Sequence, residues 1–245
     1  MILFSKKNKP QTVSLSTPFE ENLPEIPYNE HPRPMMQRED FLLLNGEWSL
    51  KAVNEKSLEY SGKIVVPFPP ESRASGVEKM FNKDSVLVYE KVFSVPQNFK
   101  GKRIFLTFDA VDQIAVVFLN GKVLGKNMGG YLPFQFEITD FLLDGENLLK
   151  VEVTDQTDNE LPFGKQRIKR GGMWYTTISG IWQSVWLEAR AQTHIKNLKM
   201  TPTLDEVVFE VEGGEDLKTL EISTSSGKIT KEFTGEKFAL KIENP

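Results

Sequence analysis

Carboxylate, amide and aromatic side chains gather in one polar stretch in the second half of the chain. Asp155, Gln156 and Asp158 open this stretch, and Trp174 and Tyr175 lie near its end. Carboxylates and amides accept or donate hydrogen bonds, and an aromatic ring offers a flat apolar face. We therefore predict a ligand-binding loop, with Asp155, Asp158 and Trp174 as its candidate substrate ligands.

The same residues also have structural explanations, which the sequence leaves open. Aspartate is a common turn former after a strand, and large aromatic side chains mostly serve burial. The stretch is also locally basic, and such a run is usually a solvated face. Because arginine binds carboxylates through paired hydrogen bonds, the run could instead meet a carboxylate of the ligand. The basic residues are Lys165, Arg167, Lys169 and Arg170.

Two strands must hold this loop in place. Before it, Leu149, Val151 and Val153 alternate with charged residues, which is typical of a strand with one buried face. After it, the stretch from Trp182 to Glu188 carries apolar bulk on both faces, which predicts a well-buried strand containing Trp182 and Trp186. The loop between them, 154–178, is longer than most connections without secondary structure, and this length favours a binding role.

Short strand patterns separated by turn residues run along most of the chain. The dipeptides Asn45-Gly46 and Asn120-Gly121 are strong hairpin signals. Thr139 can cap a single helical turn, and no longer amphipathic helix is predicted. Strands at spacings of roughly 8–12 residues indicate an all-β sandwich, and their number suits a two-sheet jelly roll.

The pattern divides the chain into three parts. Residues 1–40 are rich in proline and have no sustained period, which predicts an extended arm. Residues 41–190 hold the jelly roll. A new set of strands begins at 191 and runs to 245, which is short of the roughly 100 residues of an immunoglobulin-like sandwich. We therefore expect this last part to be a truncated domain.

The composition argues against several classes of protein. A net charge of −4 argues against a nucleic-acid partner, which needs a basic face. The absence of cysteine excludes disulfides and thiol chemistry. His31 and His194 are the only histidines and lie far apart, so we expect neither a metal site nor a Ser-His-Asp triad, and no cofactor is predicted.

The sequence contains no transmembrane run, which predicts no membrane partner. The first ten residues, MILFSKKNKP, place a few apolar residues before lysines. This stretch is too short for the apolar region of a signal peptide. The expected location is therefore the cytoplasm.

Seven local sequences, in this order along residues 41–190, resemble the N-terminal part of glycoside hydrolase family 2, the group of β-galactosidases, β-glucuronidases and β-mannosidases. They are LNGEWSL (44–50), VPFPPES (66–72), YEKVFSVP (89–96), VVFLNGKVLG (116–125), GGYLPFQFEITDFL (129–142), NLLKVEVTDQTD (147–158) and SGIWQSVWLE (179–188).

The resemblance implies a jelly-roll, galactose-binding-like domain, then an immunoglobulin-like sandwich, of which 191–245 would be the opening strands. In the family a (β/α)₈ barrel with two catalytic glutamates follows, and such a barrel needs about 250 residues. The family's acid/base glutamate follows an asparagine. Asn29-Glu30, Asn54-Glu55 and Asn159-Glu160 occur here outside any βαβ pattern. We therefore predict no catalytic residue in this chain.

The function that the resemblance implies is the N-terminal, non-catalytic portion of a retaining exo-β-glycosidase of the β-galactosidase or β-glucuronidase type, inactive by itself. Its partners would be a carbohydrate substrate and the barrel of the same full-length chain, with a homo-oligomer left open. In the family's β-galactosidases an aspartate just after the matching strand contacts the sugar, and Asp155 occupies that place. The alternative is a free-standing carbohydrate-binding module without catalytic activity.

Overall fold

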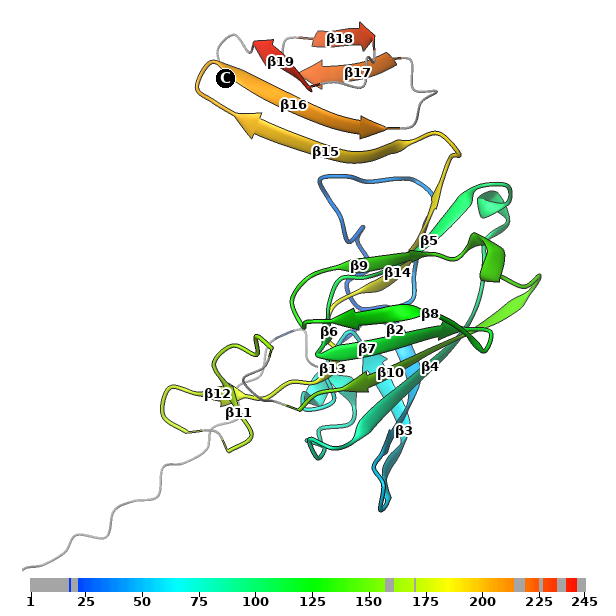
Figure 1. The fold of residues 1–245 in the computed structure, drawn as a ribbon, viewed down its shortest axis with the longest axis vertical. Coiled ribbons are helices and arrows are strands. Elements are labelled where there is room, and N and C mark those ends of the chain that lie inside the picture. The colour runs from blue at the N-terminus through cyan, green and yellow to red at the C-terminus, as the bar shows by residue number, and fades with distance from the viewer. Residues whose placement is uncertain are drawn as a thin grey trace, which may run out of the picture.

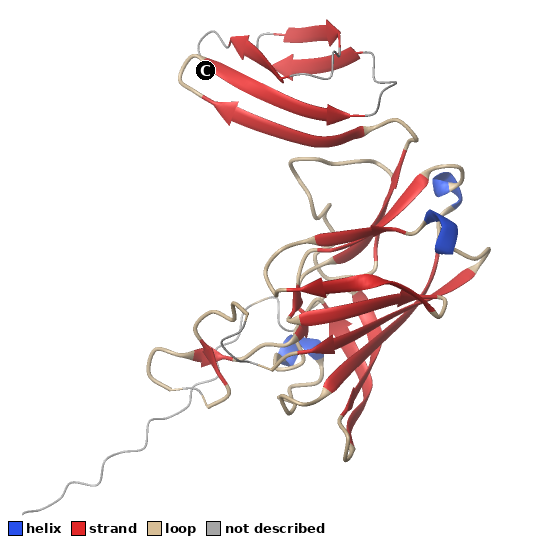
Figure 2. Ribbon diagram, in the orientation of Figure 1, coloured by secondary structure: helices blue, strands red, loops and turns tan. Residues whose placement is uncertain are grey.

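The computed structural model shows an almost entirely β protein (Figures 1 and 2). In the part of the chain that it describes, no helix has the length and apolar character needed to cross a membrane. The described residues are 18, 22–156, 161–169, 171–213, 219–224, 227–232 and 237–241.

Two antiparallel sheets form the sandwich. The four-stranded sheet has the order β1 (Phe41–Leu43), β14 (Val185–Arg190), β5 (Arg103–Phe108), β9 (Phe134–Glu137). The six-stranded sheet has the order β3 (Leu58–Val66), β2 (Gly46–Val53), β4 (Val86–Ser94), β10 (Glu146–Thr154), β7 (Ile114–Leu119), β8 (Lys122–Met128). This arrangement confirms the predicted all-β sandwich.

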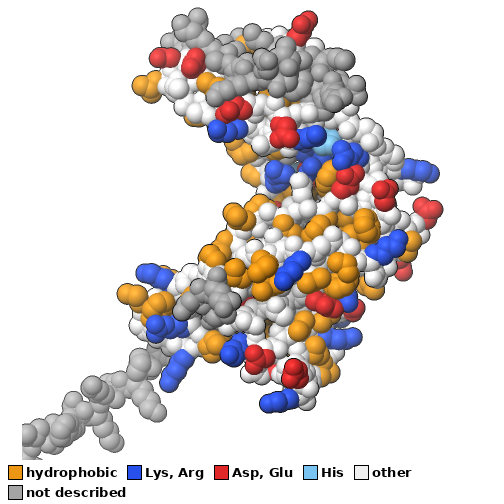
Figure 3. Space-filling view, viewed as in Figure 1, with side chains coloured by type: hydrophobic (Ala, Val, Ile, Leu, Met, Phe, Trp, Pro, Cys, Tyr) orange, Lys and Arg blue, Asp and Glu red, His pale blue; other side chains and the backbone are white. Residues whose placement is uncertain are grey.

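The core lies between these two sheets. Strand β10 alternates as predicted, and Leu149, Val151 and Val153 are fully buried. All six residues of β14 are buried, as its two apolar faces indicated. Trp186 is fully buried in β14, whereas Trp182, just before it, is only half-buried. On the outer surface, the face seen in Figure 3 mixes apolar side chains with both signs of charge.

Shorter elements connect the strands. β6 (Val111–Asp112) pairs with β13 (Gly180–Ile181), and the long loop contains a short parallel pair, β11 (Gln166–Arg167) and β12 (Tyr175–Thr176). A helical turn is present at the expected place, as the 3-10 turn η3 (Thr139–Phe141), but the prediction that Thr139 caps it is wrong. Ile138 is the cap residue, and Thr139 Oγ1 accepts from the Ile104 amide at 2.9 Å. Two further 3-10 turns are η1 (Arg73–Ser75) and η2 (Gln97–Phe99).

The two Asn-Gly predictions had opposite outcomes. Asn120 and Gly121 both have positive φ, 51° and 79°, and join β7 to β8 in a hairpin, as predicted. The hairpin prediction at Asn45-Gly46 is wrong, because β1 pairs with β14 and β2 pairs with β3. Asn45 instead bonds to distant groups: its Nδ2 donates to Pro27 O at 2.9 Å, and its Oδ1 accepts from the Val185 amide at 3.0 Å.

Further sheets follow the sandwich along the chain. One is three-stranded, with the order β15 (Ile195–Pro202), β16 (Glu206–Gly213), β19 (Lys237–Lys241), and the other pairs β17 (Thr219–Thr224) with β18 (Gly227–Glu232). The β content predicted after residue 190 is therefore present. The boundaries at 40 and 190 stay predictions.

Candidate functional site

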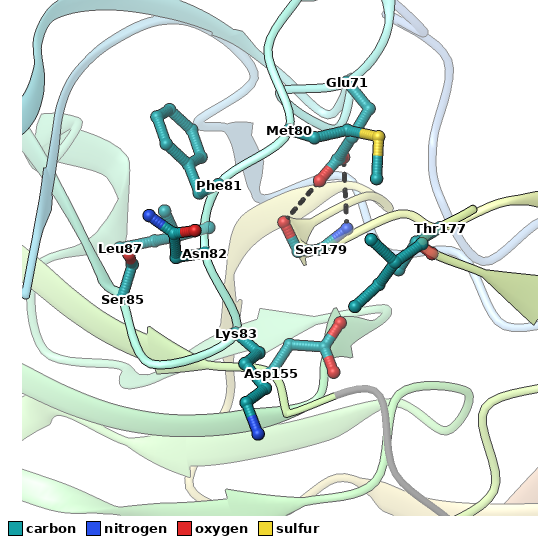
Figure 4. A pocket seen from close by; sticks show the side chains of 11 residues that line it. Glu71, Met80, Phe81, Asn82, Lys83, Ser85, Leu87, Asp155, Thr177 and Ser179 are labelled. Carbon is teal, nitrogen blue, oxygen red and sulfur yellow. Dashed lines mark hydrogen bonds between the residues drawn. The ribbon is translucent and has the colours of Figure 1, made fainter.

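A small hollow brings together three segments that are far apart in the sequence (Figure 4). Glu71 lies just before η1, Asp155 directly follows β10, and Ser179 directly precedes β13. The Glu71 carboxylate accepts hydrogen bonds from Ser179 Oγ at 2.7 Å and from the Ser179 amide at 3.2 Å. Thr177 and Lys83 also line the hollow. The predicted ligand Asp155 is thus placed beside a second carboxylate.

Burial and like charge govern the ionisation of this cluster. Burial raises the pKa of Glu71 to about 7, and the charge of Asp155 adds to the rise, while the hydrogen bonds from Ser179 oppose it. Burial also raises the pKa of Asp112 to about 7, and the negative charges of Asp155 and Glu71 contribute to the same rise. Near neutral pH, Glu71 and Asp112 can therefore each hold or release a proton.

Glycines allow the backbone to come close to these polar groups. Gly180 has φ +77°, and a Cβ there would lie 2.0 Å from the hydroxyl of Tyr89, whose side chain is fully buried. At Gly130 a Cβ would lie 2.4 Å from Asp112 Oδ1. Larger residues at either position would displace the groups that surround the carboxylates.

The hollow is too small for a sugar ring. Its volume is about 30 Å³, far below the roughly 300–1,000 Å³ of ligand pockets. A sugar that contacts Asp155 must therefore lie across the mouth of the hollow. No group of three or more histidine, cysteine or acidic side chains able to hold a metal ion occurs among the residues that the structure describes.

Of the two predicted ligands that the structure describes, only Asp155 lines the hollow. Asp155 lines the hollow, whereas Trp174 is half-buried in the loop and carries the Arg167 guanidinium 3.9 Å from its ring centre. Asp158 lies outside the described residues. In the basic run, Lys165, Arg167 and Lys169 are exposed, and Arg170 again lies outside the described residues. Trp174 thus contacts the Arg167 guanidinium through its ring face, and its role as a sugar ligand stays a prediction.

Residues that the sequence analysis missed anchor the loop and the hollow. Gln166 is buried, and its Nε2 donates to Phe163 O at 2.7 Å and to the Tyr131 hydroxyl at 3.2 Å. Its Oε1 accepts from the Ile178 amide at 2.7 Å. Glu71 belongs to the motif VPFPPES, which the sequence analysis used only for the family resemblance. Only the fold shows that Glu71 accepts hydrogen bonds from Ser179. Both histidines are held by local contacts, with the Arg33 amide on His31 and Ala191 O beside His194.

Titration of the cluster gives a stability prediction. Glu71 keeps its proton to about pH 7 when folded, but loses it near 4.5 when unfolded. The folded state thus binds more protons in this window, and the Glu71 contribution falls as pH rises from about 4.5 to about 7. We expect Glu71→Gln to remove this fall, of the order of 2 kcal/mol, when urea unfolding is measured across the window.

Other groups titrate nearby, so the comparison must be made between variants. Burial lowers the pKa values of His31 and His194, and both therefore favour the folded state as pH rises towards 6.5. Asp112 acts in the same direction as Glu71. Glu90→Gln, on the outer face of β4, is the matched control. Identical pH slopes for Glu71→Gln and Glu90→Gln would contradict the assignment.

The chain is similar in sequence to a known protein family and to known enzymes. Residues 73–190 match the family model of the sugar binding domain of glycosyl hydrolases family 2. A β-galactosidase of Thermoanaerobacter pseudethanolicus is 33% identical over 147 residues, which are 59% of this chain and 19% of that enzyme. A β-glucuronidase of Formosa agariphila is 35% identical over 108 residues, which are 44% of this chain and 11% of that enzyme. The chain thus spans under a fifth of the length of these relatives.

Solved structures show the same fold. The β-glucuronidase of Bifidobacterium dentium, complexed with coumarin-3-O-glucuronide, has a TM-score of 0.63 at 22% identity, over 84% of this chain and 43% of that one. The β-glucuronidase of Ruminococcus gnavus has a TM-score of 0.64 at 20% identity, over 86% of this chain and 40% of that one. At these identities the likeness concerns the fold alone.

Proposed function

We propose that the chain, whose residues 73–190 match the sugar binding domain of glycosyl hydrolases family 2, is the N-terminal, non-catalytic portion of a retaining exo-β-glycosidase of the β-galactosidase or β-glucuronidase type. The observation that carries this proposal is the partial match to both kinds of enzyme, which covers 19% and 11% of their lengths. The catalytic glutamates would then lie in a barrel elsewhere in the full-length protein.

The geometry of the described residues favours a role in positioning the substrate over a role in catalysis. Glu71 and Asp155 line a hollow of about 30 Å³, which is far smaller than the roughly 300–1,000 Å³ of ligand pockets. Asp155 would instead present one acceptor at the mouth, where the barrel brings the substrate. The preceding strand, with Val151 and Val153 fully buried, holds the start of this loop rigidly.

The exposed basic run bears on the choice of sugar. Lys165, Arg167 and Lys169 are exposed near Trp174, and they support the hypothesis that the loop meets a uronic acid carboxylate. The cytoplasmic location and a homo-oligomer stay predictions from the sequence. The alternative function is a carbohydrate-binding module that works without a barrel, and the same sandwich would serve it.

We expect the 245-residue chain to hydrolyse no aryl β-glycoside, because both catalytic glutamates of the retaining mechanism belong to the barrel. Purified chain is assayed against nitrophenyl galactoside, glucuronide and mannoside. Turnover above that of buffer, abolished by a substitution in this chain, would contradict the proposal. The source gene is read beyond codon 245 in parallel. A reading frame that encodes a barrel with paired glutamates supports the enzyme, and a stop codon supports the binding module.

A further inference from the structure

A second cavity is lined in part by residues that follow β13 in the sequence, whereas the Asp155 hollow is lined by residues that precede β13. Ser179, which bonds Glu71, precedes β13, whereas Trp182 follows it and lines this cavity. The cavity has a volume of about 580 Å³, within the range of ligand pockets, roughly 300–1,000 Å³. Its walls come from the arm (28–37), the turn 67–69 and the residues before β14. We call it the aromatic groove.

Three aromatic side chains give the groove its character. Tyr28 is 55% exposed although it is large and apolar, and its backbone has φ 52°, unusual for a residue other than glycine. Its ring lies 5.8 Å from that of Phe68, measured between centroids. Trp182 is fixed by a 2.8 Å hydrogen bond from its Nε1 to Gly130 O. Rings held in this way and left open to solvent are typical of ligand platforms.

The arm that forms one wall is anchored to the sandwich. Pro27 O accepts from Asn45 Nδ2 at 2.9 Å, and the Arg33 amide donates to His31 Nδ1 at 3.0 Å. The His31 ring packs on Trp186 with a centroid distance of 5.3 Å. The groove is therefore formed before any ligand binds, which lowers the entropic cost of binding.

Polar side chains that line the aromatic groove determine which charge a ligand can carry. Asp109 Oδ1 accepts from Trp186 Nε1 at 3.2 Å, while Asp109 Oδ2 has no hydrogen-bond partner among the described residues. Glu30 and Gln183 are exposed at the rim. Two carboxylates repel an anion but accept hydrogen bonds from hydroxyl groups. This combination of acceptors and aromatic faces fits an uncharged sugar better than a uronic acid.

We propose that the aromatic groove is an accessory binding site for a neutral oligosaccharide, separate from the hollow at Asp155. The site needs neither the barrel nor the catalytic activity, so it can be tested on this chain alone. It would hold a glycan chain on the protein at a place other than the Asp155 hollow.

The chain carries four tryptophans, and their indole N–H signals report different places in the molecule. Trp182 reports the groove, Trp174 reports the loop, and the buried Trp48 reports the core. Cellobiose, lactose and mannobiose are titrated into ¹⁵N-labelled chain, with glucuronic acid as the charged probe. We expect at least one disaccharide to shift the Trp182 signal saturably while Trp48 stays unchanged, and glucuronic acid to bind more weakly.

Variants connect the signal to the groove. Tyr28→Ala should weaken binding about tenfold, because it removes one aromatic platform. Tyr175→Ala is the matched control, since Tyr175 is 69% exposed and lies outside the groove. Phe68→Leu keeps apolar volume and tests a second platform. An unchanged Trp48 signal shows that each variant is folded.

Several results would overturn the proposal. They are an unmoved Trp182 signal with all three disaccharides, shifts confined to Trp174, and equal weakening by Tyr28→Ala and Tyr175→Ala. A fourth is binding of glucuronic acid, measured at the Trp182 signal, as tight as that of the disaccharides, because glucuronic acid that shifts Trp174 alone is bound to the loop.

Discussion

Replacement of Glu188 by alanine is expected to lower the free energy of unfolding by about 3–5 kcal/mol. Glu188 is fully buried in β14, and its Oε1 accepts from Arg38 Nη1 at 2.6 Å and from Arg190 Nε at 2.5 Å. Arg190 is only 5% exposed. Without Glu188 the Arg190 guanidinium keeps the cost of burial but loses its counter-charge. Urea unfolding followed by tryptophan fluorescence measures the difference.

Glu152→Ala is the matched control for this prediction. Glu152 pairs with Lys150 at 2.7 Å, but both side chains are about a third exposed, so the pair should contribute at most about 1 kcal/mol. Arg38 also donates to Ile195 O at 2.7 Å, where β15 begins. Equal losses for Glu188→Ala and Glu152→Ala would mean that the buried network contributes no more than a surface pair.

The second large effect concerns Asp155, in a full-length protein that includes the proposed barrel. Asp155→Asn is expected to lower kcat/KM on the best glycoside at least about tenfold, because a charged acceptor bonded to sugar hydroxyls contributes roughly 1.5–3 kcal/mol. The melting temperature should stay the same or rise slightly. The charge of Asp155 raises the pKa values of Glu71 and Asp112, so its removal relieves repulsion.

Asp140→Asn, an exposed aspartate in η3, is the matched control and should leave both kcat/KM and the melting temperature unchanged. If Asp155→Asn keeps its activity while the melting temperature falls, Asp155 belongs to the scaffold. The sugar contacts of the loop would then have to come from Asp158 or Trp174. The inactivity of the separate chain tests the proposed function independently of this result.

Local sequence determined the strands and one of the turns. The alternation of Leu149, Val151 and Val153 predicted the buried face of β10, since successive side chains of a strand point to opposite sides. Asn120-Gly121 predicted the β7–β8 hairpin, because both residues tolerate positive φ. These features depend on neighbours in the sequence, and seven local motifs in order also sufficed to indicate the family.

Only the tertiary structure decided which distant groups meet. Asn45-Gly46 has the same local preference as Asn120-Gly121, yet Asn45 bonds Pro27 and Val185 and the chain crosses between sheets there. Glu188 carries a charge, yet its side chain is fully buried because Arg38 and Arg190 neutralise it. The meeting of Glu71 with Asp155 likewise depends on the pairing of remote strands, and no local pattern encodes the burial that raises the pKa of Glu71.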